Sequence, residues 1–371
     1  MRVAITGVGA VGFWGNEYSA FTSQLTNPEL PNKVATVPEL DFFTIVGTKN
    51  KRTKKMERLS RIVSIAAKGA MELAGLKKDD VAPGRGAVVT GSSFGALDSI
   101  LTFHRQLETD GASSVNPNVF PPTSHNVAGG HLSIEFGFSG PLIHFASGSL
   151  SSEQALLYGY DLIRTGRADV VITGGWDILC EDLLKSFALP TEISANPLSP
   201  SSKSFLPAEG AALVVLESEE HAQKRAAQIN AWLEGGSVWS DNHFAKGKET
   251  LKNLDCKPSD FSHVCLSANG IADKDERESS WLRKLFLEAE VAPPAIIIPR
   301  QSTGDTFGAN GAFNLVSAVA HFAGVPIKVD VPNPSVPGAG YFQTEREDKG
   351  KVLLSNLTAS DEAALLVVLP V

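Results

Sequence analysis

A serine, a histidine and an aspartate are placed so that they could form a hydrolase-type triad. Ser149 starts a helical pattern, His144 lies five residues before it, and Asp305 lies far along the chain. A serine becomes nucleophilic when a positioned base takes its proton and a third group orients that base. His144 and Asp305 could fill those roles in a serine-dependent acyltransferase or thioester hydrolase. We favour the alternative, in which His144 lies on a strand that feeds the helix and packs into the interior.

A second motif resembles a nucleotide site. The run Gly7-Val-Gly-Ala-Val-Gly12 matches the G-x-G-x-x-G fingerprint, which requires an acidic residue at the end of a second strand about 20 residues on. That position falls in residues 26–43, which contain prolines and no hydrophobic strand. We therefore interpret the glycines structurally, as residues that turn the chain closely after the first strand.

Composition excludes several classes of protein. The 371 residues are 43% hydrophobic, enough for a large core, and the net charge of −8 argues against nucleic acid as a partner. The three cysteines fit neither a zinc site nor a disulfide framework, which favours a reducing cytoplasm. No basic leader and no apolar window of about 18 residues is present, so we expect neither export nor a membrane span. We expect no metal and no cofactor.

Short β-branched runs alternate with helical patterns, which predicts an α/β fold. The predicted strands are Val3–Thr6, Ala87–Thr90, Asp169–Thr173, Ala212–Leu216, Val264–Ser267, Ile296–Pro299, Val352–Ser355 and Leu365–Leu369. The predicted helices are Glu57–Ala74, Ser152–Thr165, Glu276–Ala289 and Ala312–Ala323.

A weak internal repeat indicates duplication. The paired runs 168–175 and 209–217 resemble 350–357 and 361–370, and a glycine-flanked helix start precedes each pair, at 146–149 and at 308–311. We expect two related halves, roughly 1–228 and 229–371, in one compact body without a flexible linker.

Four stretches together resemble the elongating β-ketoacyl synthases. They are GHLSIEFGFSGPLIHFASGSLSSEQALLYGYDLIRTGRADVVITGGWD (130–177), KKMERLSRIVSIAAKGAMELAGL (54–76), AEGAALVVLESEEHAQKRAAQINAWLEGGSVWSDN (208–242) and STGDTFGANGA (302–312). The resemblance implies the thiolase-type fold, two duplicated βαβαβαββ halves in a five-layer αβαβα sandwich, and an obligate dimer.

The family carries a nucleophilic cysteine at a helix N-terminus, where the helix dipole favours a thiolate. Counted from Gly140-Pro141, that position is Ser149 in this chain. A serine hydroxyl stays protonated at neutral pH without a base.

The family's two histidines and its lysine also have other residues at the matching positions. Asn269 stands in the H-G-T segment, where the chain is about two residues shorter than the family pattern, and Asp305 stands in the T-G-H segment. Arg300 corresponds to the lysine. An amide cannot relay a proton, and a carboxylate would repel an enolate. The resemblance therefore implies degenerate positions, and we expect no catalytic residue in this chain.

The C-terminal G-F-G-G loop of active members corresponds to residues 356–360, which contain no glycine. Together with the replacements at Ser149, Asn269 and Asp305, this loss resembles the chain-length factors, the ketosynthase-like subunits of type II polyketide synthases. Many of those carry glutamine where this chain has Ser149, so both an aromatic-polyketide and an aryl-polyene factor stay open.

The resemblance also assigns an interface. His125 and His131 lie near the family's dimer-interface region, and Phe120, Phe136 and Phe138 flank a loop that crosses to the partner's acyl tunnel. Core packing is the default for such aromatic residues. The functional alternative is that some of them cap the tunnel and set product length.

Five cations fall in one short run, formed by Lys49, Lys51, Arg52, Lys54 and Lys55. We favour a solvated loop. The alternative is docking of an acidic partner, which the resemblance identifies as the acyl carrier protein.

These observations lead to a main hypothesis with two alternatives. The main one is a non-catalytic chain-length factor that forms a heterodimer with an active ketosynthase and shapes the acyl tunnel. The alternatives are a serine-dependent acyltransferase or hydrolase that uses Ser149, and a purely structural subunit that recruits the acyl carrier protein.

Overall fold

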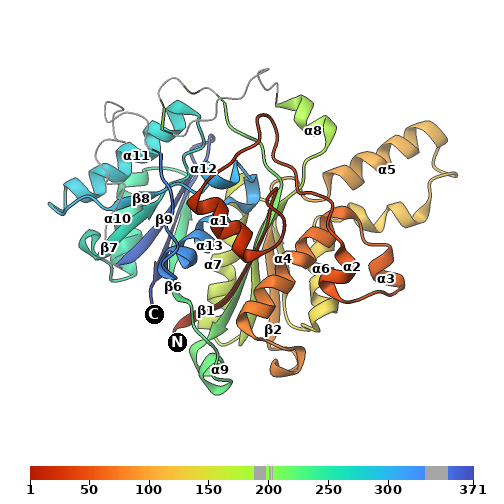
Figure 1. Ribbon diagram of the computed structural model, residues 1–371, viewed down its shortest axis with the longest axis horizontal. Coiled ribbons are helices and arrows are strands. Elements are labelled where there is room, and N and C mark those ends of the chain that lie inside the picture. Colours follow the sequence, from red (N-terminus) through yellow and green to blue (C-terminus); the bar gives the residue numbers. More distant parts are fainter. Residues whose placement is uncertain (188–197, 200–201, 203, 331–349) are drawn as a thin grey trace.

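The computed structural model describes residues 1–187, 198–199, 202, 204–330 and 350–371 (Figure 1). Its strands are β1 (Val3–Val11), β2 (Gly86–Gly91), β3 (Leu142–Phe145), β4 (Val170–Asp177), β5 (Gly210–Ser218), β6 (Ala231–Trp239), β7 (Phe261–Cys265), β8 (Ala295–Ile297), β9 (Lys351–Leu357) and β10 (Ala363–Leu369). Its helices are α1 (Tyr18–Thr26), α2 (Phe42–Val46), α3 (Lys51–Lys54), α4 (Arg58–Ala74), α5 (Leu97–Asp110), α6 (Val127–Phe136), α7 (Ser151–Arg164), α8 (Glu181–Ser186), α9 (Glu219–Lys224), α10 (His243–Asn253), α11 (Ala272–Leu287), α12 (Arg300–Thr303) and α13 (Asn310–Phe322).

The strands form one sheet whose order repeats. The order is β3-β2-β4-β5-β1-β6-β10-β9-β7-β8. Counted outward from the middle of the sheet, the first half runs β1-β5-β4-β2-β3 and the second runs β6-β10-β9-β7-β8, so corresponding strands occupy corresponding places. Directions repeat as well: β2 is parallel to β3 and β4, as β7 is to β8 and β9, whereas β4–β5 and β9–β10 are antiparallel. An antiparallel pairing of β1 with β6 joins the halves. The predicted duplication is confirmed at the level of topology.

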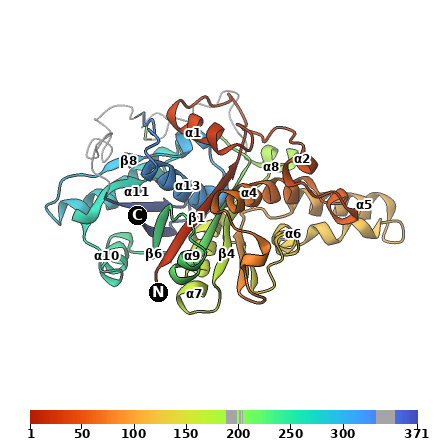
Figure 2. The same cartoon turned by 60° about the horizontal axis from the view of Figure 1, so that its bottom comes forward.

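Helices form layers inside and outside the two sheet halves (Figures 1 and 2). Side chains of α7 and α13 share one core cluster with strands of both halves, so these two helices lie between them. Helices α4 and α6 cover the outer face of the first half, and α10 and α11 cover the outer face of the second. The resulting order of layers is the predicted five-layer α/β sandwich.

Strand residues alternate between these core clusters because successive side chains point to opposite faces. In β5, Ala212, Val214 and Leu216 face α7 and α13, whereas Leu213 and Val215 face α4. Both faces are buried, which explains why the strands read as continuous apolar runs.

The interpretation of the first glycine motif is wrong. β1 continues through Val11, beyond the predicted end at Thr6, so Gly7 and Gly9 lie inside a buried strand and form no turn. A Cβ at Gly7 would lie 2.0 Å from the Ala70 carbonyl oxygen, and one at Gly9 would lie 2.1 Å from that of Ala66. The glycines therefore allow α4 to pack directly on β1.

Sequence periodicity missed β3 and β6. β3 is a four-residue strand at one end of the sheet and is only partly buried, so it carries little apolar signal. β6 contains Gly235 and Gly236, and its pairing with β10 shifts register at Gly235, where φ is +120°. Glycines at a bulge interrupt the apolar pattern from which a strand is recognised.

The division into halves at residues 228 and 229 stays a proposal. It would fall between α9 and β6, in the segment that crosses from one half of the sheet to the other. In the described part of the chain, none of the helices combines the length and the apolar character needed to cross a membrane.

The contact of β1 with α4 predicts opposite effects for two facing glycines. Gly9→Ala should lower the free energy of unfolding by about 1–3 kcal/mol, because the new methyl group meets helix backbone. Gly69→Ala, whose methyl group would have ordinary contact distances, should be neutral or stabilising by up to about 1 kcal/mol. Denaturant unfolding measures both, and equal effects would contradict the proposed packing.

Candidate functional site

Ser149 lies in a tight turn between β3 and α7. The turn, η4 (Gly148–Leu150), leads into the helix and is held by the Ser151 hydroxyl. That hydroxyl accepts from the Ser147 N–H at 2.9 Å and lies 2.7 Å from the Gly148 carbonyl oxygen. Ser149 is partly exposed, and no side chain among the described residues hydrogen-bonds to its hydroxyl.

His144 is not placed to activate Ser149. Its Nδ1 lies 3.2 Å from the Thr90 hydroxyl and its Nε2 lies 3.1 Å from the Ser92 hydroxyl, while the ring stacks on Trp176 at 5.1 Å. Burial lowers the pKa of His144 to about 4. The packing interpretation of His144 is confirmed, and the triad of Ser149, His144 and Asp305 does not form.

Asn269 and Asp305 contact each other directly. The Asn269 amide donates to Asp305 Oδ2 at 2.7 Å, and both side chains are buried. The other oxygen, Oδ1, accepts from the Phe307 N–H at 3.0 Å and from the Asn310 amide at 2.7 Å. Burial alone would raise the pKa of Asp305, but the Arg300 charge and these donors outweigh it and lower the pKa.

Arg300 lies at the start of α12 and is buried. One of its guanidinium nitrogens donates to the Ser267 carbonyl oxygen, and another lies 3.4 Å from Asn356 Oδ1. This cation therefore connects Ser267, two residues beyond the end of β7, with Asn356, near the end of β9.

Asn356 completes the connection to Ser149. Its amide nitrogen donates to the Ser149 carbonyl oxygen at 3.1 Å and also to the carboxyl group of Glu153. Glu153, in the first turn of α7, is fully buried, and burial raises its pKa to about 7. Arg300, Asn356, Glu153, Asn269 and Asp305 are hereafter called the central network.

Two further buried charged residues, Lys274 and Glu278, lie next to the central network and share Ser267 with Arg300. The Lys274 ammonium donates to the Ser267 carbonyl oxygen at 2.6 Å, and Glu278 accepts from the Ser267 N–H at 2.9 Å and the Ser355 hydroxyl at 2.6 Å. Burial lowers the pKa of Lys274 and raises that of Glu278. Sequence reasoning missed Glu153, Lys274 and Glu278; the only available signal was charge at helical positions that periodicity assigns to the interior.

A tight β-hairpin stands where the family has its glycine-rich C-terminal loop. β9 and β10 are joined by a tight hairpin, closed by the Thr358 N–H to the Glu362 carbonyl oxygen at 2.8 Å. Asp361 occupies the left-handed region, with φ of +66°. The hairpin directs Asn356 inward toward Ser149.

Asp177 anchors the segment that follows Asp305 in the chain. At the end of β4, it accepts from the backbone N–H groups of Ser93 and Phe94 at 2.9 Å and of Gly308 at 2.7 Å. Burial raises the pKa of Asp177 to about 7. Because Gly308 belongs to the segment between Asp305 and α13, this carboxyl group fixes that segment against the first half.

The basic run contains a short helix, so the predicted loop is wrong, whereas the predicted exposure to solvent is confirmed for four of its five cations. Residues 51–54 are α3, begun by a capping box between Asn50 and Thr53. Lys49, Lys51, Lys54 and Lys55 are exposed, whereas Arg52 turns inward.

Arg52 ties α3 to α6. It forms an ion pair with Glu135 and lies 3.3 Å from His131 Nδ1, and burial lowers the pKa of that histidine.

The aromatic candidates separate into two groups. Phe136 and Phe138 are buried in the core cluster between α4, α6 and β2, which favours the packing interpretation. Phe120 is 62% exposed and touches Phe103 of α5 edge-on at 5.6 Å. His125 is exposed and lies against Gly95.

Comparison with known proteins identifies the family. The family model for the β-ketoacyl synthase N-terminal domain matches residues 36–222, about half of the chain. Nodulation protein E of Rhizobium leguminosarum bv. trifolii is 27% identical over 312 residues, which cover 77% of each protein. Putative polyketide beta-ketoacyl synthase 1 of Streptomyces cyaneus is 26% identical over 87% of this chain and 86% of its own length.

Solved structures agree in fold. The ishigamide ketosynthase/chain length factor superposes with a TM-score of 0.88 at 19% identity, covering 100% of this chain and 99% of its own. A type II polyketide ketosynthase solved with its acyl carrier protein gives a TM-score of 0.82 at 20% identity, with the same coverage. The chain belongs to the β-ketoacyl synthase family and has the thiolase-like ketosynthase fold.

The raised pKa of Glu153 predicts that the free energy of unfolding depends on pH. Its raised pKa means that the folded chain holds a proton between about pH 4.5 and 7 that the unfolded chain releases, so its contribution to stability falls over that window. Glu153→Gln should remove the part of this decline that Glu153 causes, up to about 3 kcal/mol in the free energy of unfolding between pH 4.5 and pH 8. Asp177, whose pKa is also raised to about 7, keeps its own part of the decline in both proteins.

Unfolding at pH 4.5 and pH 8 measures this difference. Glu72→Gln, at an exposed carboxylate of α4, is the matched control and should leave the pH profile unchanged. A Glu153→Gln profile parallel to that of the wild-type protein would contradict the assignment.

Proposed function

We propose that this chain is a non-catalytic chain-length factor that pairs with an active ketosynthase and limits the growth of its polyketide product. The partner supplies the cysteine and the histidines. This subunit completes the assembly and closes the acyl tunnel. Whether the pathway is aromatic or aryl-polyene does not affect this division of labour.

The central network is the observation that carries the proposal. Condensation needs a nucleophile, a base and free hydrogen-bond donors for the developing oxyanion. Here the Asn269 donor contacts Asp305, and Asn356 is engaged by Glu153 and the Ser149 carbonyl group. Groups that satisfy one another are not available to a thioester.

Exposed apolar residues support pairing with a second subunit. β3 stands at one end of the described sheet, and its Leu142 is 38% exposed. Ile134 on α6 and Phe120 beyond α5 are each 62% exposed. In both views α5 extends away from the body of the molecule (Figures 1 and 2). An open strand edge beside exposed apolar side chains is typical of a protein interface.

The comparisons support the identity of the partners. Proteins of the same fold include a ketosynthase/chain length factor and a ketosynthase bound to its acyl carrier protein. Both partners are assigned to this chain by analogy with them.

Co-expression with a ketosynthase tests the pairing. The two chains should purify as a 1:1 complex, and Ile134→Asp should abolish it because the new carboxylate would be desolvated in an apolar contact. Leu287→Asp, at a 48% exposed leucine of α11, is the matched control and should leave the complex intact. A condensation-competent homodimer of this chain would overturn the proposal.

Product length tests the role in the tunnel. Phe120→Ala removes the exposed ring that is proposed to cap the acyl tunnel. The wider tunnel should shift the product distribution of the complex toward longer chains, as measured by liquid chromatography and mass spectrometry. Phe138→Leu, in the core, is the control and should not change the distribution. An unaltered distribution in Phe120→Ala, with the complex intact, would favour a purely structural subunit.

A further inference from the structure

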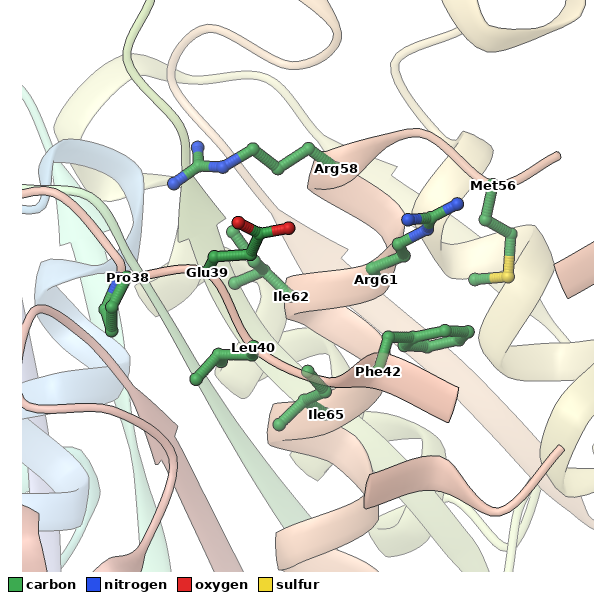
Figure 3. Close-up of a pocket in the computed structure, with 9 residues that line it drawn as sticks. All are labelled: Pro38, Glu39, Leu40, Phe42, Met56, Arg58, Arg61, Ile62 and Ile65. Carbon is green, nitrogen blue, oxygen red and sulfur yellow. The ribbon is translucent and has the colours of Figure 1, made fainter. Parts of the chain in front are cut away.

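A pocket of about 430 Å³ opens between α4 and the segment before α2 (Figure 3). Its volume lies within the range of small-molecule sites. None of the central network lines it, so the pocket is separate from the ketosynthase-like site. Most of its lining is apolar and consists of Pro38, Leu40, Phe42, Met56, Ile62 and Ile65. Four of these side chains belong to the core cluster around α4, so the pocket has fixed walls.

Three charged residues complete the lining. Figure 3 shows the guanidinium groups of Arg58 and Arg61 on one side, with the Glu39 carboxylate between them. Arg58 is already engaged, because it donates to Glu209 at 2.8 and 2.7 Å and to the Val37 carbonyl oxygen at 2.8 Å. Glu39 is exposed, and within the described residues no ion pair joins it to either arginine.

Arg61 has no carboxylate partner in the part of the chain that the structure describes. One terminal nitrogen donates to the Lys54 carbonyl oxygen at 3.3 Å, whereas Nε is buried and has no hydrogen-bond acceptor there. The guanidinium also lies 5.8 Å from the Phe42 ring and 5.6 Å from the Phe43 ring. A buried donor without an acceptor costs free energy, and a carboxylate is among the strongest acceptors for a guanidinium. An available cation beside apolar walls therefore fits a ligand with a carboxylate head and an apolar tail.

We propose that this pocket binds a small amphiphilic carboxylate, whose head contacts Arg61 and whose hydrocarbon chain lies against the apolar walls. Burial of the chain supplies most of the affinity, and the guanidinium fixes the orientation. The Glu39 carboxylate at the rim repels the head and weakens binding. A fatty acid and a conjugated polyene acid share this chemistry. The site does not depend on the proposed chain-length role, because it uses only groups that line the pocket.

Calorimetric titration of the full chain with octanoate tests the contact with the head group. Octanol carries the same hydrocarbon chain without the charge and is the comparison ligand. Arg61→Gln should weaken octanoate binding by at least about fivefold and leave octanol binding unchanged, because only the carboxylate uses the guanidinium. Equal losses for the two ligands, or no loss for octanoate, would overturn the proposal.

Glu39→Gln gives an independent test of opposite sign. Glu39 is exposed, so the variant should fold, and removal of the like charge should strengthen octanoate binding by about two- to threefold at low salt. Glu29→Gln, at an exposed glutamate outside the pocket, is the matched control and should not change the affinity. Unchanged or weaker binding in Glu39→Gln would contradict the assigned position of the head group.

Leu40→Trp tests whether the ligand occupies this pocket. Leu40 lies on a loop and is only partly buried, so the larger ring should fill the pocket and abolish binding of both ligands. Leu287→Trp, at a 48% exposed leucine of α11, is the control and should bind like the wild-type protein. Octanoate binding retained in Leu40→Trp, or absent from the wild-type protein, would overturn the proposal.

A parallel titration with 2,4-octadienoate distinguishes the two sources of the ligand. Tighter binding of the flexible octanoate would support a fatty acid, and tighter binding of the rigid dienoate would support a polyene acid. Complex formation with the ketosynthase should be the same in Arg61→Gln as in the wild-type protein, so a failure of this site is distinguishable from a failure of the proposed function.

Discussion

Buried charges that can be satisfied only by one another constrain the centre of this molecule. Two sheet halves enclose α7 and α13, and the polar residues at the beginnings of these helices are cut off from water. An unpaired charge there would cost several kcal/mol, so each carboxyl group needs a donor or a proton. Asp305 has its amides and the Arg300 charge, whereas Glu153 is pushed toward protonation. The positions of the surrounding turns follow from this requirement.

Because the buried polar groups are bound to one another, the groups free to contact other molecules lie on the surface. The interior of an active condensing enzyme must leave groups free for a thioester, whereas here Asn356 and Asp305 have protein partners. The features available to other molecules are on the outside, in the exposed Phe120 and Ile134 and in the exposed lysines in and beside α3. This distribution is consistent with a subunit that acts by contact with its partners.

Much of the fold could be predicted from the sequence because buried strands and amphipathic helices leave strong periodicities. α4 and α7 were predicted to within one residue at each end. The duplicated topology could also be predicted, because related strand pairs keep similar sequences. β3 and β6 could not, because a partly exposed edge strand and a glycine bulge weaken the pattern. The turn predicted at Gly7 and Gly9 was wrong because close helix packing and tight turns both select glycine.

The site was predictable only in part. Matching the sequence to the motifs of the family identified Ser149, Asn269 and Asp305, and the structure places them in one region. The role of Glu153 depends on Asn356, about two hundred positions away, and no local pattern reveals such a partner. The inward turn of Arg52 likewise depends on Glu135 from a different helix.

The central claim is that the residue at the nucleophile position forms no acyl intermediate. The most direct measurement is mass spectrometry of the intact chain, followed by peptide mapping, after incubation with an acyl thioester. The account predicts an unmodified Ser149, because no base contacts its hydroxyl within the described structure. An acyl group found on Ser149, and lost in Ser149→Ala, would contradict it.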